Sequence, residues 1–169
     1  MTLVVPFDGS NLAEAALVRA AKFGSVFDQP VVALSVVPEG NSDYARDHGW
    51  LGPDEEFDVD TVVASLRGQV SDLYPSADFR HEVVDRYASP GVIAKRVRRV
   101  AKEEDAAMVF VGSENAGRLV SGLSSVGATV ATDQNYDVVI IRHPNPAGID
   151  KLREASPETA DESAVFRSE

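Results

Sequence analysis

Short apolar runs alternate with stretches of helical periodicity along most of this chain, and this alternation restricts the fold more than any other feature. The runs have the length and composition of strands that are buried on both faces. The five expected strands are Leu3–Phe7, Val31–Val37, Phe79–Val84, Ala107–Val111 and Val138–Ile141. Strands that alternate with helices predict an α/β fold, in which helices cover both faces of a mainly parallel sheet.

Helix-capping residues mark where the segments between the strands should become helical. Ser10 or Asn11 can cap a first helix, which should end within residues 24–28. Ser89 followed by Pro90 is typical of a helix start, because proline at the first helical position gives up no hydrogen bond. Two further helices are expected over residues 59–73 and about 121–132.

The segment between the second strand and the helix over 59–73 is acidic. Eight acidic residues lie from Glu39 to Asp60, against the basic residue Arg46. Such a run is typical of a solvated loop that leads into the acidic first turn of a helix. We expect Trp50, the only tryptophan of the chain, to anchor this loop to the body of the protein.

The formal net charge of -11 at pH 7 excludes a general affinity for nucleic acid or for an anionic membrane. No apolar run approaches the roughly 20 residues that span a bilayer, and we expect a cytoplasmic protein. The absence of cysteine excludes disulfides, thiolate catalysis and cysteine-ligated metals. No pair of histidines has metal-ligand spacing, so no metal site is expected. Acidity combined with scarce lysine suggests adaptation to high salt.

Five basic residues lie within eight positions of the helix that starts at Pro90, and they form the one basic patch of an acidic sequence. They are Lys95, Arg96, Arg98, Arg99 and Lys102. Two interpretations remain open. The favoured one is a solvated helix face that balances nearby acidic side chains. The other is a docking face for an acidic protein partner.

Three expected strands end at residues that would meet on one edge of the sheet. In a parallel sheet the carboxyl ends of strands lie together, and ligands of open α/β sheets bind there. The ends of the first, second and fourth strands therefore place Asp8, the backbone of Val36 and Val37, and the loop 112–128 around one crevice. The glycines of that loop would let the backbone approach a phosphate, although loop glycines are more often turn residues.

Five short segments also have a recognisable order and spacing. They are Val5–Ser10, Ser35–Pro38, Ser89–Ile93, Val109–Ser113 and Val138–Ile141. Together they resemble the universal stress protein A family over about residues 2–143. The resemblance implies a Rossmann-like, three-layer α/β fold with a five-stranded parallel sheet in the order 3-2-1-4-5.

The resemblance also implies an assembly and a domain boundary. Members of the family usually form homodimers that pair through the last strand, which corresponds here to Val138, Val139, Ile140 and Ile141. An apolar edge strand suits that role, because its unpaired backbone invites pairing with a second copy. We expect one universal-stress-type domain over residues 1–143 and an acidic, flexible tail over 144–169.

Members of the family divide into ATP binders and members that bind no nucleotide. In the binders, an acidic residue after the first strand and the backbone at the end of the second hold the adenosine. The resemblance carries these roles to Asp8 and Val36. The phosphates bind a motif of glycine, two residues, glycine, nine residues, glycine, then serine or threonine. The corresponding positions here are Gly112, Gly117, Gly127, Ala128 and Thr129.

This chain keeps the phosphate motif only in part. Nine residues separate Gly117 from Gly127, as the motif requires, but four residues rather than two separate Gly112 from Gly117. Glu114 occupies the in-register position and would add negative charge beside the phosphates. Ala128 replaces the hydroxyl residue and removes a hydrogen-bond donor, whose loss typically costs about 0.5–1.5 kcal/mol.

Two functions follow from the resemblance. The first is a regulatory protein that binds ATP, with Mg, in the crevice at the carboxyl ends of the first and fourth strands. The alternative is a nucleotide-free member that acts as a homodimeric protein interaction module. No general base is recognisable for a phosphate-bound water, so we expect no catalytic residue and at most slow ATP hydrolysis.

Overall fold

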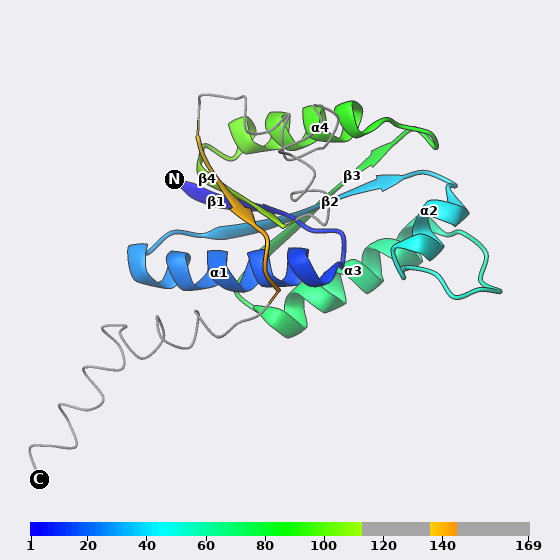
Figure 1. Cartoon of the computed structure of the whole chain (residues 1–169), viewed down its shortest axis with the longest axis horizontal. Helices are drawn as coiled ribbons and strands as arrows, with labels where there is room; N and C mark the ends of the chain where they lie inside the picture. Colours follow the sequence, from blue (N-terminus) through cyan, green and yellow to red (C-terminus); the bar gives the residue numbers. More distant parts are fainter. Residues whose placement is uncertain (113–135, 145–169) are drawn as a thin grey trace, which may run out of the picture.

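Five strands and four helices make up the part of the chain that the computed structural model describes, residues 1–112 and 136–144 (Figure 1). In chain order they are β1 (Thr2–Pro6), α1 (Asn11–Phe27), β2 (Val31–Pro38), α2 (Ser42–Asp47), α3 (Val59–Leu73), β3 (Asp78–Val84), α4 (Pro90–Glu103), β4 (Ala106–Gly112) and β5 (Asp137–Ile141). All five expected strands are present. The helix expected over about 121–132 lies outside the described residues.

The sheet has the strand order β3-β2-β1-β4-β5, and every neighbouring pair is parallel. From β1 the chain moves outward through β2 to β3, and then crosses to the other side of β1 for β4 and β5. The direction of winding therefore reverses at β1, which is the topological position where open α/β sheets form their ligand crevice. The expected Rossmann-like fold with the order 3-2-1-4-5 is confirmed.

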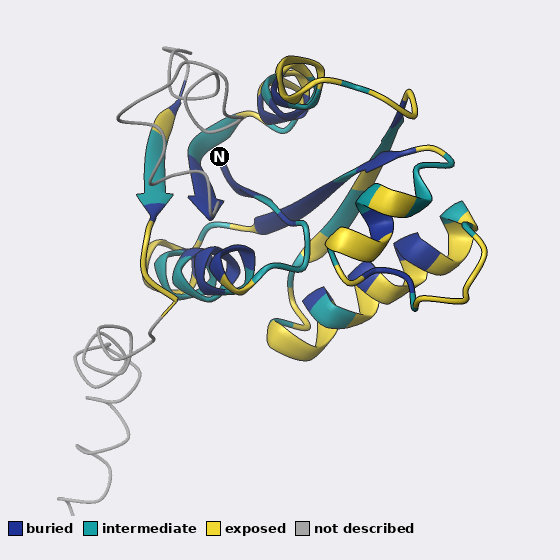
Figure 2. Ribbon diagram, turned by 45° about the vertical axis from the view of Figure 1, so that its right-hand side comes forward, coloured by how far each residue is buried: buried dark blue, intermediate teal, exposed yellow. Residues whose placement is uncertain are grey.

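Helices α1 and α3 lie on one face of the sheet and α4 lies on the other (Figure 1). The buried side chains form two clusters, one on each face, and much of the central strands has the dark blue of buried residues in Figure 2. The larger cluster includes Leu17, Leu66 and Phe110, while the smaller one includes Leu34 and Val97. Burial on both faces explains why the central strands are continuous apolar runs in the sequence.

Local sequence signals determine where the three long helices begin. Ser10 caps α1, because its hydroxyl accepts a hydrogen bond from the backbone N–H of Ala13 (3.2 Å). Asp58 caps α3 in the same way, and Ser89 caps α4 directly before Pro90. Each side chain satisfies a backbone donor that has no partner within its helix. The helix starts expected from Ser10 and Ser89 are confirmed.

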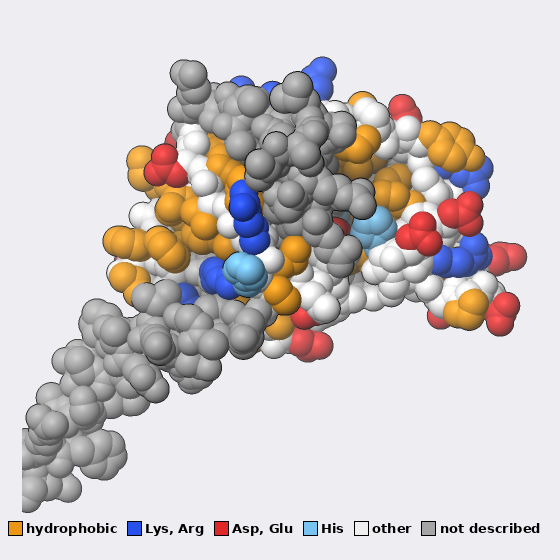
Figure 3. Space-filling model, viewed as in Figure 1, with side chains coloured by type: hydrophobic (Ala, Val, Ile, Leu, Met, Phe, Trp, Pro, Cys, Tyr) orange, Lys and Arg blue, Asp and Glu red, His pale blue; other side chains and the backbone are white. Residues whose placement is uncertain are grey.

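The acidic segment after β2 is more ordered than the solvated loop that the sequence predicts. It contains the short helix α2 and folds back so that Ala45, Trp50 and Leu51 join the larger cluster. Several acidic side chains gather on the side of the molecule that carries α2 (Figure 3). The prediction of a solvated loop was wrong for α2 and for Trp50 and Leu51, because the apolar side chains of this part pack into the larger cluster. The expectation that Trp50 anchors the segment is confirmed, because only 5% of the residue is exposed.

Candidate functional site

The parallel register brings three of the predicted site residues to one edge of the sheet. Pro6, the last residue of β1, pairs with Leu34, so Asp8 follows the end of β1 by the same two residues that separate Val36 from Leu34. The pairing of β1 with β4 brings Gly112 level with the end of β1. The remaining positions of the glycine motif lie outside the described residues: Glu114, Gly117, Gly127, Ala128 and Thr129.

Asp8 is held by hydrogen bonds from both sides. Its carboxylate Oδ1 accepts a bond from the backbone N–H of Ser10 (3.0 Å), and its carbonyl oxygen accepts one from the indole Nε1–H of Trp50 (2.7 Å). Directly before it, the buried hydroxyl of Ser35 donates to the carbonyl of Phe7 (2.6 Å). Within residues 1–112 and 136–144, no ion pair involves Asp8. The half-buried carboxylate is therefore fixed without a neighbouring cation in that part of the chain.

The backbone of Val36 faces the gap that opens where β1 ends. In a parallel sheet, the N–H and C=O groups of successive residues point alternately to the two neighbouring strands. The carbonyl of Leu34 accepts from the N–H of Phe7 on the β1 side, and Glu39 N–H donates to Val84 on the β3 side. Val36 therefore points its backbone groups toward β1, beyond the last residue pair of the two strands.

Gly112 lies against the first turn of α1, and this contact leaves no room for a side chain. A Cβ atom added at Gly112 would lie 1.9 Å from the carbonyl oxygen of Leu12 and 2.8 Å from the backbone nitrogen of Ala13. The packing of β4 against α1 is thus a sufficient reason for glycine at this position. Sequence reasoning proposed Gly112 as a phosphate-binding glycine and missed this contact, because it joins elements that are about 100 residues apart.

Three aromatic side chains, Tyr44, His48 and Trp50, pack together beside Asp8 and are called the aromatic cap. The rings of Tyr44 and His48 stack with centroids 4.0 Å apart, and Trp50 meets Tyr44 edge-on at 5.5 Å. The spacing of Tyr44 on α2 and its C-cap His48, four residues apart, is a signal that could have revealed their contact. Sequence reasoning identified only Trp50 as an anchor.

The hydroxyl of Tyr44 also interacts electrostatically with the charge of Asp8. Burial and, to a lesser extent, the negative charge of Asp8 raise the pKa of this hydroxyl from 10.0 to about 12. Both effects disfavour the ionised phenolate, which would be a second anion in a partly desolvated site. The aromatic cap therefore stands close enough to Asp8 for the two to interact electrostatically.

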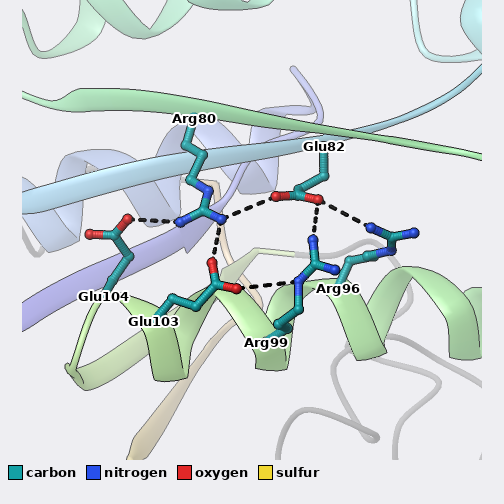
Figure 4. Close-up of polar contacts among 6 residues, drawn as sticks. All are labelled: Arg80, Glu82, Arg96, Arg99, Glu103 and Glu104. Carbon is teal, nitrogen blue, oxygen red and sulfur yellow. Dashed lines mark hydrogen bonds and ion pairs between the residues drawn. The ribbon is translucent and has the colours of Figure 1, made fainter.

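A second cluster of polar side chains joins β3 to α4 and is called the charge network (Figure 4). It consists of Arg80, Glu82, Arg96, Arg99, Glu103 and Glu104. At its centre the carboxylate of Glu82 contacts Arg80 (3.2 Å), Arg96 (3.3 Å) and Arg99 (2.5 Å). Arg80 also binds Glu103 and Glu104, and Arg99 binds Glu103.

The charge network explains part of the basic patch of α4. Burial by itself would raise the pKa of Glu82, but the hydrogen bond from Arg80 and the charge of Arg99 outweigh it, so the pKa lies below its usual value. Arg96 and Arg99 thus balance an acidic side chain on the neighbouring strand. For these two residues, the favoured interpretation of the patch as a charge-balanced helix face is confirmed.

The sequence predicts neither a metal site nor a membrane-spanning segment, and the structure bears on these two predictions only within the described residues. Across 1–112 and 136–144, no group of three or more histidine, cysteine or acidic side chains is arranged to hold a metal ion. Among the helices of that same part of the chain, none is long and apolar enough to cross a membrane.

The strand order defines a Rossmann-like α/β protein whose switch point lies at β1. The family model of the universal stress protein family matches residues 1–142. The chain therefore belongs to the universal stress protein family. Among curated proteins, none matches this sequence.

Solved structures of universal stress proteins share this fold at low sequence identity. One, crystallised in complex with cAMP, is 21% identical with a TM-score of 0.52 and covers 84% of this chain and 97% of its own. A second, from Archaeoglobus fulgidus in complex with dAMP, is 20% identical with a TM-score of 0.52, covering 84% and 98%. A third, from Burkholderia pseudomallei, is 18% identical with a TM-score of 0.55, covering 84% and 96%. At these identities the likeness establishes the fold alone.

Proposed function

We propose that this chain is a regulatory protein that binds an adenine nucleotide, ATP with Mg, in the crevice at the carboxyl ends of β1 and β4. The proposal rests on two groups near the end of β1: a carboxylate held in place by hydrogen bonds and a backbone segment whose N–H and C=O point away from β3. Asp8 lies two residues beyond the end of β1, and Val36 lies on the neighbouring strand β2 with its backbone facing the gap beyond that end. The proposed role is nucleotide-dependent regulation, with at most slow hydrolysis of the ligand.

The chemistry of these two groups suits an adenosine. The N–H and C=O of Val36 offer one donor and one acceptor in fixed positions, which match the donor and acceptor on the edge of an adenine ring. The Asp8 carboxylate has no ion-pair partner among the described residues and can accept hydrogen bonds from ribose hydroxyls. Two of the structurally similar universal stress proteins were crystallised with adenine nucleotides, cAMP and dAMP, which supports the choice of base.

The phosphates would extend toward the glycine motif of the loop after β4. Gly117 and Gly127 have the spacing of the family motif, which supports a triphosphate. Glu114 and Ala128 weaken that support, because one adds a negative charge and the other removes a donor. These two departures favour the second candidate function, a nucleotide-free homodimeric interaction module.

Calorimetry at the protein's working salt concentration separates the two candidates. We expect Mg-ATP to bind the wild-type chain with measurable heat and Mg-GTP to bind more weakly, because guanine reverses the donor and acceptor that face Val36. Asp8→Asn should weaken Mg-ATP binding roughly ten- to one hundred-fold, as the loss of a charged hydrogen-bond partner predicts. If the wild-type chain gives no heat and is purified without adenine nucleotide, the nucleotide-free candidate is supported instead.

A homodimer through β5 is part of both candidate functions. In the described sheet β5 is an edge strand with β4 as its neighbour, and Val138, Val139 and Ile140 are only half-buried. A second copy that pairs along this edge would cover them. We expect Ile140→Lys to raise the monomer fraction in analytical ultracentrifugation, whereas the control Val26→Lys, at an exposed position on α1, should leave it unchanged. A dimer that survives Ile140→Lys would have to use another surface.

A further inference from the structure

We propose that Trp50 is a positioning residue of the nucleotide site, which acts by fixing Asp8 in the orientation that the ligand needs. The inference rests on the proposed function, because it concerns the same crevice. It goes further by assigning a role to a side chain that is 42 residues from Asp8 in the sequence and belongs to no motif of the family resemblance.

Trp50 is rigid enough for this role. It is almost fully buried, its ring packs against Tyr44 and His48, and its own backbone N–H donates to the carbonyl of Ala45 at 2.8 Å. An indole has a single donor, the Nε1–H, and here that donor ends on the carbonyl oxygen of Asp8 at 2.7 Å. The aromatic cap therefore has a direct connection to the backbone of the site.

The bond constrains the turn that carries the carboxylate. Gly9, directly after Asp8, has a φ of +79°, a backbone conformation that residues other than glycine rarely adopt. A Cβ on Gly9 would lie 2.9 Å from Oε1 of Gln69 and 3.6 Å from Nε1 of Trp50, so the turn is also enclosed. With its carbonyl held by Trp50 and its Oδ1 held by Ser10, Asp8 has little freedom to reorient.

This arrangement couples the cap to the ligand. A ribose that binds the Asp8 carboxylate changes the surroundings of a residue whose carbonyl accepts from the indole N–H. The chemical shift of the indole N–H should therefore change on binding. Without the indole donor, the peptide between Asp8 and Gly9 can rotate, and part of the binding free energy is then lost to ordering the turn.

The experiment uses the full chain and the single indole signal that its only tryptophan gives in an amide-correlated NMR spectrum. In the wild type we expect the indole N–H to exchange slowly with solvent and to shift when Mg-ATP is added. Trp50→Phe, which keeps an aromatic ring and removes the donor, should weaken Mg-ATP binding roughly five- to twenty-fold in calorimetry. The matched control His48→Phe alters the same cap without touching Asp8, and its affinity should stay within about two-fold.

Each result decides the inference. Wild-type binding with an unshifted indole signal, or with unchanged affinity in Trp50→Phe, overturns the positioning role and leaves the proposed function intact. No binding by the wild type overturns both. An equal loss in Trp50→Phe and His48→Phe also overturns the inference, because it reports general damage to the cap. If Trp50→Phe does not fold, the wild-type indole shift decides alone.

Discussion

Asp8 and Glu82 are two carboxylates placed beside the same sheet, and their surroundings are opposite. Glu82 receives three arginine side chains from β3 and α4, and only 14% of its side chain is exposed. Asp8 receives one backbone N–H on its carboxylate, and no ion pair reaches it within residues 1–112 and 136–144. One carboxylate is saturated by protein groups, while the other keeps acceptor capacity for a ligand.

The difference shows that two carboxylates near the same part of the sheet have different roles, since Glu82 pairs with Val36 on the strand next to β1. A carboxylate surrounded by arginines contributes to holding β3 against α4, because each partner satisfies the charge of the others. A carboxylate held in place without a cation contributes little to folding and remains available for binding. The two residues should therefore respond in opposite ways when each is changed, one in stability and the other in affinity.

The largest expected loss of stability near the sheet edge that leads to Asp8 comes from a substitution at Gly112, where β4 meets α1. Gly112→Ala should lower the free energy of unfolding by about 3 kcal/mol or more, because its Cβ would collide with backbone that cannot move independently. Urea denaturation followed by circular dichroism measures the loss. The control Gly68→Ala, at an exposed position of α3 with open space around it, should instead stabilise by about 0.5–1 kcal/mol. A Gly112→Ala chain of wild-type stability would mean that β4 does not approach α1 this closely.

Exchanging carboxylate for amide at both sites tests the comparison directly. Glu82→Gln should destabilise the fold by about 2 kcal/mol at neutral pH, because three arginines lose their common anion. Asp8→Asn should change the free energy of unfolding by less than about 0.5 kcal/mol, since the amide oxygen can still accept from Ser10. Equal losses in the two variants would remove the distinction between a structural and a ligand-binding carboxylate.

The pH dependence of folding stability tests the same comparison in a second way. The pKa of Glu82 is lower in the folded chain than its usual value of 4.5, so its contribution to stability is present above that pH and is lost as the pH falls through the folded-state pKa. Glu82→Gln removes this titration. Its denaturation midpoint should fall less steeply than that of the wild type on acidification below about pH 4.5.

The sequence predicts the fold well because burial on both faces leaves a simple pattern. Strands β1, β2 and β4 are largely apolar runs, and the caps at Ser10 and Ser89 are local signals, so each could be found without knowledge of the rest of the chain. Helix α2 was missed because six residues are too few to show a helical period, and its acidic residues resemble those of a solvated loop.

The candidate site was predictable only where position in the fold decides it. Asp8 and Val36 follow from the ends of two strands in a parallel sheet, and the structure pairs these two strands in parallel as far as Pro6 and Leu34. The indole bond from Trp50 to Asp8, the packing of Gly112 on Leu12 and the convergence of three arginines on Glu82 depend on tertiary contacts. Such contacts leave no periodic trace in a single sequence, so only the structure reveals them.

The raised pKa of Tyr44, which comes from burial and from the charge of Asp8, can be tested at high pH. The pKa of Tyr44 is raised from 10.0 to about 12 in the folded chain, so unfolded chains release this proton first and stability is lost as the pH rises from about 10 to 12. At a pH midway between these values, the loss is about 1 kcal/mol. Tyr44→Phe has no proton to release, and its stability should decline less over this range in chemical denaturation. Parallel declines would mean that Tyr44 ionises normally.

The smallest expected effect distinguishes the arginines of the charge network from each other. Arg80 binds Glu82, Glu103 and Glu104 with 31% of its side chain exposed, whereas Arg99 binds Glu82 and Glu103 with 47% exposed. Because solvent screens the more exposed pair, Arg99→Gln should cost only about 0.5 kcal/mol and Arg80→Gln about twice as much, measured by urea denaturation in low salt. Molar salt should reduce both losses, and Mg-ATP affinity should stay unchanged in each variant, because the polar contacts of Asp8 within the described residues involve neither side chain. An affinity change in Arg99→Gln would link the charge network to the site and end the separation between the two carboxylates.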